Sequence, residues 1–266
     1  MGKDLFKVTA IAGKPINAYL LMTLYETHIL GELAIWQKRM QEQPSFSSQL
    51  AKRLQNRINR AIPEKVHKAI TLTIKQMTRA VFFGAGFTTR KPIPPASFES
   101  CEMKVLERIK FYRNTAAAEG AITGAGGILL GLADFPIWLS LKMKMLFEIA
   151  TRYGYDTSRY QERVYMLHIF ELCFSSPIHR NKIYAVLADW TNYEKKLPAD
   201  INDFDWRSFQ QEYRDYIDIA KLLQLIPGIG AAVGAFVNHR LTTRLGKTAM
   251  NAYRMRRLEA EKKIDN

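Results

Sequence analysis

The chain has 266 residues, of which 47% are hydrophobic, and it carries a formal net charge of +14 with a pI near 9.7. This length and apolar content allow a substantial core, and no internal segment has the composition of a long flexible linker, so we expect one domain. The positive charge favours an anionic partner: a phospholipid membrane, nucleic acid or an acidic protein. The two cysteines, Cys101 and Cys173, exclude a disulfide framework and a CxxC metal motif.

The first residues form neither a convincing signal peptide nor a lipidation motif. Their apolar patches are short, they contain no clear cleavage site, and Phe6 occupies the position where a myristoylation motif has Ser or Thr. We expect residues 1–17 to form an N-terminal tail ahead of a single helical domain over residues 18–262.

Apolar residues at helical spacing, separated by Gly and Pro clusters, define the rest of the chain in order. We expect helices over residues 18–41, 46–61, 63–81, 97–112, 136–153, from 158 onward, 177–195, 206–226 and 228–262, with loops over 84–97 and 197–205. No segment shows the alternation of a strand. The sequence therefore predicts an all-α fold.

Three helix boundaries rest on particular residues. Asp134 lies just ahead of Pro136 and is a good N-cap for a helix that begins there. Gly154 is expected to end that helix as a left-handed residue. Ser158, followed three residues later by Gln161, has the sequence of a capping box for the next helix.

Small residues recur at helical spacing in two segments of the chain. At this spacing glycines line one stripe of a helix and let another backbone approach closely. Each glycine costs roughly 1 kcal/mol relative to alanine in a helix interior, so a packing gain must offset them. We predict two packed glycine-striped helices at the centre of the domain, with a ligand groove along them. The groove residues are Gly120, Gly124, Gly127, Gly131, Asp134, Gly230, Gly234 and Asn238.

No segment is a clean transmembrane helix. Residues 120–141 are long enough to span a bilayer but contain Asp134 and Pro136, and residues 222–238 are short and broken at Pro227. We expect a cytoplasmic protein that associates peripherally with the inner face of the membrane. Insertion of a glycine-rich segment into the bilayer is the alternative.

Several segments together resemble the EcsC family of bacterial proteins. They are AEGAITGAGGILLGLADFP, EIATRYGYD and LIPGIGAAVGAFVN, with Tyr25-Glu26 and Trp36 in the opening helix. The resemblance extends from about Tyr25 to Glu259. It implies a cytoplasmic or membrane-associated protein whose partner is an ABC transporter, for which the family is named, or another envelope system. It implies no particular reaction.

Three polar residues are weak candidates for catalysis. Asp134 is the only charge between Glu119 and Lys142, and a poorly solvated carboxylate can act as an acid or a ligand. A role as an N-cap is the favoured explanation of Asp134. Glu119 could share a site with Asp134 only if the chain turns at Gly126-Gly127 or at Gly131. His239 follows the second glycine segment. The histidines show no metal-binding spacing, so we expect neither a metal nor a cofactor.

Basic residues form two stripes at helical spacing. They are Arg240, Arg244 and Lys247 in the last helix, and Arg53, Arg57 and Arg60 in the second. A solvated face explains either stripe alone, but the chain-wide excess of positive charge favours binding to an anionic membrane. Nucleic acid is a less favoured partner because no nucleic-acid-binding motif is present.

The sequence thus favours a non-enzymatic protein that binds a membrane surface or a lipid. The alternative is a hydrolase with a carboxylate site at Asp134 and Glu119. A third possibility is a module that binds only a protein partner. Convergence of Glu119, Asp134 and His239 on one cavity would favour the enzyme.

Overall fold

A computed structural model describes residues 24–42, 64–83, 92, 97–124, 127–175, 177–205, 207–209 and 231–264. Within these ranges the chain is all-α, as predicted, and contains no strand. The helices are α2 (Leu24–Gln41), α4 (Glu64–Phe83), α5 (Phe98–Gly124), α6 (Gly127–Arg152), α7 (Tyr160–Phe174), α8 (Pro177–Ala188), α9 (Trp190–Lys196) and α12 (Ala231–Ile264), with a 3-10 turn η1 (Ile201–Asp203). The predicted tail over 1–17, the helix over 46–61 and most of the helix over 206–226 lie outside the described residues.

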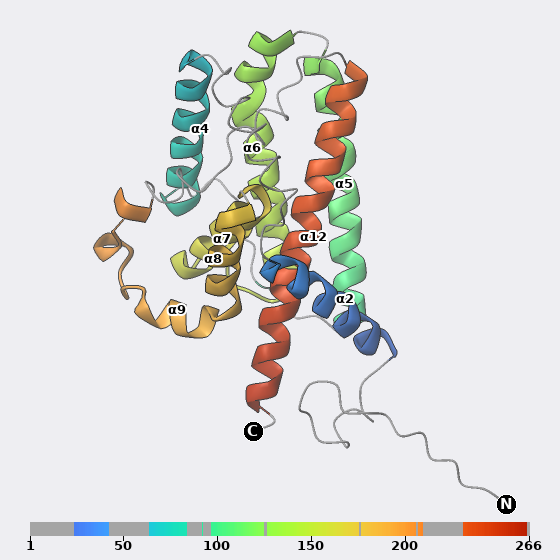
Figure 1. Ribbon diagram of the computed structural model, residues 1–266, viewed down its shortest axis with the longest axis vertical. Helices are drawn as coiled ribbons and strands as arrows, with labels where there is room; N and C mark the ends of the chain where they lie inside the picture. The colour runs from blue at the N-terminus through green and yellow to red at the C-terminus, as the bar shows by residue number, and fades with distance from the viewer. Residues whose placement is uncertain are drawn as a thin grey trace, which may run out of the picture.

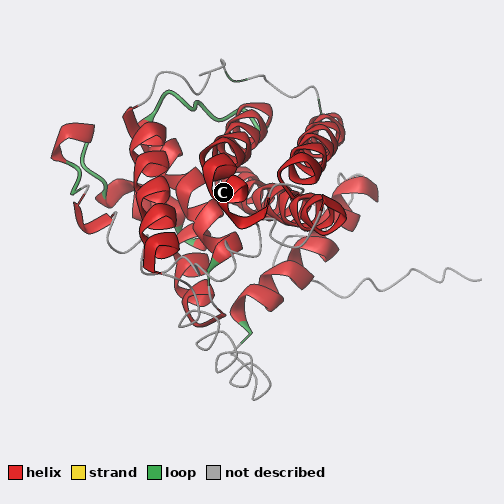
Figure 2. Cartoon of the chain, turned by 90° about the horizontal axis from the view of Figure 1, so that it is seen from above, coloured by secondary structure: helices red, strands yellow, loops and turns green. Residues whose placement is uncertain are grey.

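Three long helices form the body of the molecule (Figure 1). The chain ascends in α5, descends in α6 and descends again in α12, so α5 is antiparallel to both of the others. The most extensive packing joins α12 to α5, followed by α5 to α6. Seen from above, the C-terminal end of α12 projects at the centre of the surrounding helices (Figure 2).

The shorter helices cover this body on the other sides. Helix α7 is buried almost throughout its length and packs against α12, α4 and α8. Helix α4 also packs on α6, and α2 crosses the lower part of α12 beside α8. No helix among the described residues is long and apolar enough to cross a membrane.

A single glycine sets the close approach of α5 and α12. A Cβ atom at Gly246 would lie only 2.7 Å from Cγ1 of Ile109, so a larger residue forces the helices or the Ile109 side chain to shift. Gly246 is buried in α12. Close packing around a small residue is therefore present, but at a position outside the two predicted glycine stripes.

The first glycine segment does not form one helix. Helix α5 ends at Gly124 and α6 begins at Gly127, so the four glycines are divided between two antiparallel helices. The prediction of a single stripe is wrong in this respect. Gly234 lies in α12, Gly230 falls outside the described residues, and contact between the two glycine segments stays a prediction.

The predicted N-cap at Asp134 is also wrong. Helix α6 begins seven residues earlier and continues through Pro136. Proline removes one backbone hydrogen bond, but Phe135, Trp138 and Leu139 are buried at helical spacing on both sides of it. Burial of this face outweighs the lost bond, so the helix continues.

Two boundaries were predicted after the start of α6, the end of this helix at Gly154 and a capping box at Ser158, and only the first is confirmed. Gly154 has a φ of +88° and closes α6 as predicted, because its N–H donates to the Thr151 carbonyl while Tyr155 N–H donates to Ala150. The capping box at Ser158 is wrong. The Asp156 carboxylate accepts the Ser158 N–H at 2.8 Å, and α7 begins two residues later without a side-chain cap.

Of two other predicted features, the start of α5 is confirmed and the helix over 177–195 is confirmed in part. Ser97 precedes α5, and its hydroxyl accepts the Ser100 N–H at 3.1 Å, which caps the helix as expected. The helix predicted over 177–195 begins at Pro177 but is interrupted at Asp189, which separates α8 from α9.

Candidate functional site

The predicted catalytic residues come from three helices. Glu119 lies near the end of α5 and is half-buried, and His239 is half-buried in α12. Asp134 belongs to the second turn of α6, and its side chain lies outside the described ones. The convergence of these three groups therefore stays a prediction. Among the described residues, no group of His, Cys, Asp and Glu could hold a metal ion.

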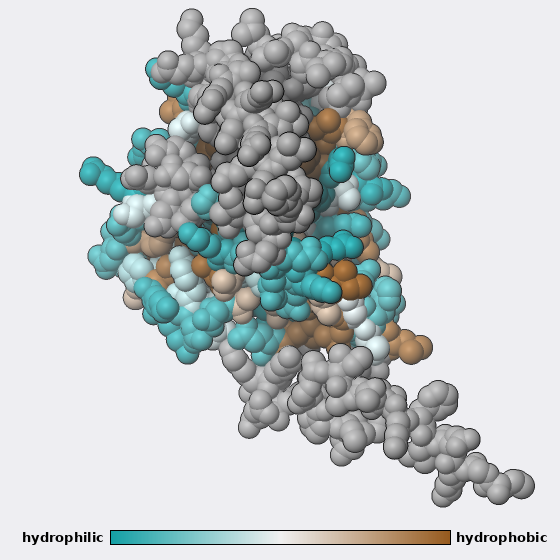
Figure 3. Space-filling view, viewed as in Figure 1, coloured by the Kyte–Doolittle hydropathy of each residue, from teal (hydrophilic) through white to brown (hydrophobic). Residues whose placement is uncertain are grey.

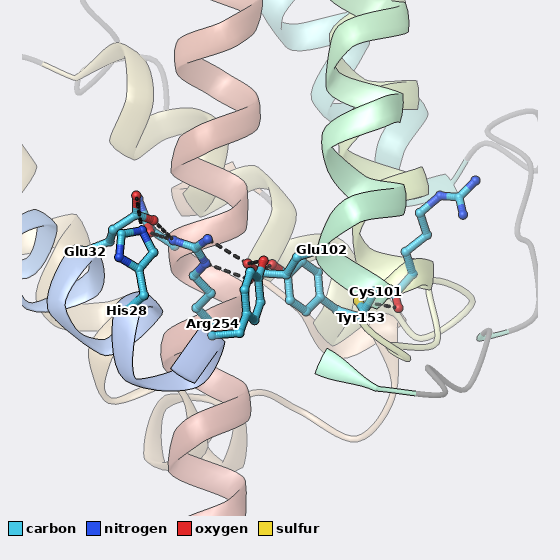
Figure 4. A network of polar contacts seen from close by, with 9 residues as sticks. His28, Glu32, Cys101, Glu102, Tyr153 and Arg254 are labelled. Carbon is cyan, nitrogen blue, oxygen red and sulfur yellow. Dashed lines mark hydrogen bonds and ion pairs between the residues drawn. The ribbon is translucent and has the colours of Figure 1, made fainter. Parts of the chain in front are cut away.

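Buried ionisable residues cluster instead around Glu102 in α5 (Figure 4). Its carboxylate accepts hydrogen bonds from the Tyr25 hydroxyl at 2.8 Å and the Tyr153 hydroxyl at 2.7 Å. Arg254 of α12 donates to both carboxylate oxygens, from Nε at 2.6 Å and Nη2 at 2.7 Å. Arg254 Nη1 also donates to Glu32 of α2 at 3.0 Å. We call these five residues the lower polar clamp, because they join α2, α5, α12 and the end of α6.

The buried residues of the lower polar clamp, Glu102, Tyr153 and Arg254, are joined by hydrogen bonds to one another. Burial and the hydrogen bond to Glu102 raise the pKa of Tyr153 well above its usual value. Burial alone would lower the pKa of Arg254, but its hydrogen bonds to Glu102 raise that pKa instead. Both groups therefore keep their protons, and four donors saturate the Glu102 carboxylate. The arrangement is structural.

A second buried carboxylate joins α5 to α6 in the same way. Glu148 accepts from Tyr112 at 2.8 Å and from Arg108 Nε at 2.5 Å. Burial, with the hydrogen bond to Glu148, raises the pKa of Tyr112 to about 12. This carboxylate is also satisfied by partners on a neighbouring helix.

A third pair joins α7 to α12. Glu162 accepts from the Tyr253 hydroxyl at 2.7 Å and from Arg256 Nη1 at 2.5 Å. The Arg256 guanidinium lies 4.1 Å from the centre of the Tyr155 ring and 4.7 Å from that of Tyr165. Cation–π contacts and an ion pair thus satisfy the same cation.

Higher in the molecule, a buried lysine lacks such partners. Lys142 of α6 is 0% exposed, and its Nζ lies 4.5 Å from the centre of the Trp138 ring. Within the described part of the chain, neither Lys142 Nζ nor Trp138 Nε1 has a hydrogen-bond acceptor. Burial lowers the pKa of Lys142 to about 7, while the nearby charge of Glu119 opposes that shift.

Asn238 lies at the same height of the bundle. The contact of Gly246 with Ile109 fixes the antiparallel register of α12 and α5. Asn238 precedes Gly246 by eight residues, which is about 12 Å along α12. The same distance along α5 from Ile109 leads to Ala117, which is two residues before Glu119. Asn238 and Glu119 therefore lie at similar heights. Asn238 is 2% exposed, and its Oδ1 accepts no hydrogen bond from a described residue. We call Glu119, Trp138, Lys142 and Asn238 the upper polar layer.

The predicted basic stripe of α12 lies on the surface. Arg240, Arg244 and Lys247 are exposed, and Phe236 continues the same face one turn earlier with an exposure of 64%. Arg180 of α8 lies near Arg244. Burial lowers the pKa of Arg180, and the positive charge of Arg244 lowers it further. We call these five residues the basic surface. The second predicted stripe, Arg53, Arg57 and Arg60, lies outside the described residues.

Apolar side chains are exposed at the height of Phe236 on the two neighbouring helices. Ile122 of α5 is 73% exposed and Ile137 of α6 is 61% exposed. Figure 3 shows apolar and hydrophilic atoms next to each other over the upper turns of α12 and α5. The exposed cations of α12 therefore extend downward from Phe236, which lies at about the height of these exposed apolar groups.

Sequence reasoning missed both the lower polar clamp and Lys142. Glu102 and Arg254 are 152 residues apart, and nothing in either segment indicates the other. Lys142 did carry a signal. It follows Trp138 by four residues and Leu139 by three, so it occupies a core position of an otherwise apolar helix face.

The fold and these sites define a class of protein: a strongly basic all-α bundle whose buried glutamates bind Arg and Tyr side chains of other helices. Comparison with known proteins identifies the family. The chain belongs to the EcsC protein family, whose model matches residues 27–258.

Two relatives from Bacillus subtilis (strain 168) match most of the chain. Protein EcsC is 40% identical over 232 residues, which cover 87% of this chain and 95% of the relative. The uncharacterized protein YdbA is 28% identical over 251 residues, which cover 86% of this chain and 91% of the relative. No solved structure matches the chain.

Proposed function

We propose that this protein binds the surface of anionic membranes through the basic surface of α12. The observation that supports the proposal is the row formed by Phe236, Arg240, Arg244 and Lys247 on one exposed helix face. These residues span roughly 16 Å at 1.5 Å per residue. Cationic side chains in a row attract anionic headgroups, and an exposed aromatic ring at one end of the row can contact the membrane interface.

Charge supplies most of the expected affinity. A Lys or Arg near an anionic leaflet contributes about 1 kcal/mol, and salt screens this contribution. Arg180 adds a fourth cation beside Arg244. Ile122 and Ile137 are exposed at the same end of the bundle and can contact the acyl boundary together with Phe236. The net charge of +14 acts in the same direction.

The test is co-sedimentation with vesicles that contain or lack anionic lipid, at low and high salt. A variant with Arg240, Arg244 and Lys247 changed to Gln should lose most of its binding to anionic vesicles. A control with Lys110, Lys195 and Lys196 changed to Gln removes the same charge from exposed positions elsewhere and should bind as the wild type does. Equal losses in both variants, or equal binding to neutral vesicles, would contradict the proposal.

An ABC transporter is the protein partner that the family resemblance suggests. We propose it as a second ligand for the same protein and assign it to no surface. Pull-down of the membrane fraction with the two triple variants would show whether such a partner uses the basic surface as well.

A further inference from the structure

The upper polar layer contains buried donors without acceptors. Lys142 Nζ and Trp138 Nε1 are inaccessible and have no acceptor among the described residues, and Asn238 Oδ1 has no donor there. A buried polar group without a partner costs free energy, and buried groups of this kind in native proteins are normally satisfied by protein, water or ligand. The layer is therefore suited to a molecule that brings its own polar atoms.

The surroundings of the donors are apolar on one side. Trp138 stacks on Phe135 with ring centres 5.7 Å apart and meets Phe174 edge-on at 6.2 Å. Ile122 lies one turn beyond Glu119, and Ile137 immediately precedes Trp138; both are exposed. An apolar chain could thus extend from the layer towards the exposed side chains at the upper end of the bundle.

We propose that the upper polar layer binds the carboxylate of a single-chain amphiphile of the fatty-acid class, with Lys142 as its cation and the Trp138 N–H as a second donor. This inference goes beyond the proposed surface binding and does not depend on it. The ligand enters from the upper end of the bundle. Asn238 lies at about the same height of the bundle, on α12.

The charges of the upper polar layer favour a ligand that carries a single negative charge. Lys142 supplies one cation, and Glu119 already lies close enough to influence it electrostatically. A dianionic phosphate would repel the Glu119 carboxylate more strongly than a carboxylate does. An uncharged alcohol of the same length would leave the Lys142 ammonium without an ionic partner.

The test uses palmitate labelled with 13C at its carboxyl carbon, titrated into the full chain and followed by NMR. The wild type should bind about one equivalent saturably, with a shifted carboxyl resonance. Lys142→Met should weaken binding roughly tenfold to hundredfold, the range for a charged hydrogen bond. Lys144→Met is the matched control, because Lys144 is exposed on the same helix. It should bind as the wild type does.

A second variant keeps the inference testable if Lys142→Met does not fold. Trp138→Phe retains an aromatic ring and removes only the N–H, and it should weaken binding about threefold to tenfold. Unchanged affinity in Lys142→Met or, where that variant is unfolded, in Trp138→Phe would overturn the proposal. Equal binding of hexadecanol or of hexadecyl phosphate would overturn the assignment of a carboxylate. These results are independent of whether vesicle binding is found.

Discussion

The lower polar clamp and the upper polar layer bury ionisable groups between the same three helices, yet they differ in how those groups are satisfied. Glu102 accepts four hydrogen bonds from Tyr25, Tyr153 and Arg254. Lys142, which is equally buried, has, among the described residues, the Trp138 ring and the electrostatic influence of Glu119 but no hydrogen-bond acceptor. Burial alone therefore does not tell a structural charge from a candidate ligand-binding charge. The geometry of the partners does.

The difference has an energetic consequence. Removing one partner of a satisfied buried pair leaves an uncompensated charge, which is strongly destabilising. Replacing an unsatisfied buried charge with an apolar side chain removes a penalty instead. Substitutions in the two regions should therefore have opposite effects on stability.

The largest expected effect is a loss of stability in the clamp. Arg254→Met leaves the Glu102 carboxylate buried without its cation and should lower the free energy of unfolding by about 3–5 kcal/mol. Urea denaturation is the measurement. Arg240→Met, an exposed position on the same helix, should change it by less than about 0.5 kcal/mol. Equal effects of the two variants would remove the distinction between a clamp and a surface charge.

In the upper polar layer we expect removal of the charge to raise the stability of the fold, by an amount that depends on pH. The Lys142 pKa is about 7 in the folded chain and 10.5 in an unfolded reference. Between these values the unfolded chain binds more protons, so stability rises with pH over that window and the penalty is complete below it. Lys142→Met removes the penalty and should stabilise the fold at pH 7 by up to about 4 kcal/mol.

The control for this prediction is again Lys144→Met, which should leave both stability and its pH dependence as in the wild type. The informative quantity is the difference in unfolding free energy between wild type and variant at pH 6.5, 8 and 9.5. It should shrink as pH rises. A difference that is constant with pH would mean that Lys142 is not the titrating group.

A smaller loss of stability is expected at Gly246, whose contact with Ile109 sets the register of α12 against α5. Gly246→Ala places a Cβ within 2.7–2.9 Å of three carbons of Ile109 and should cost about 1–3 kcal/mol. Ile109→Val removes one methyl group and should restore part of the loss in the double variant. Thermal unfolding of the single and double variants measures this. Additive losses would show that the two residues do not oppose each other.

The smallest effect should follow from Tyr25→Phe. It removes one of the four hydrogen bonds to Glu102 and leaves Arg254 in place, so a cost of about 1 kcal/mol is expected. A loss as large as that of Arg254→Met would mean that α2 docking, rather than the ion pair, dominates the clamp. The two variants are best compared by urea denaturation at one pH.

Local signals in the sequence predicted the local structure well. Periodic apolar residues located the helices that the structure describes, and Gly154 ended α6 because its left-handed conformation suits glycine. The family resemblance was confirmed across residues 27–258. Predictions failed where two local signals competed. Pro136 did not end or begin a helix, because buried residues on either side favoured continuation. At Ser158, the neighbouring Asp156 took the backbone N–H instead.

The candidate sites were harder to predict because they depend on contacts between distant segments. Nothing near Glu102 indicates that its partner is Arg254. Lys142 was detectable as a charge at a core position of α6, but the absence of an acceptor among the described residues depends on how other helices pack around it. The convergence of Glu119, Asp134 and His239 stays a prediction.

The lower polar clamp also determines when the domain can fold during its synthesis. Glu32 and Arg254 are separated by 222 residues, so a ribosome adding 5–20 residues per second supplies the arginine roughly 10–45 s after the glutamate. Until Arg254 is made, Glu102 has no arginine partner from α12, and α2 has no arginine to hold it against the nascent bundle. The domain can therefore close only late in its own synthesis, and nascent chains arrested before Arg254 should keep α2 accessible to proteases.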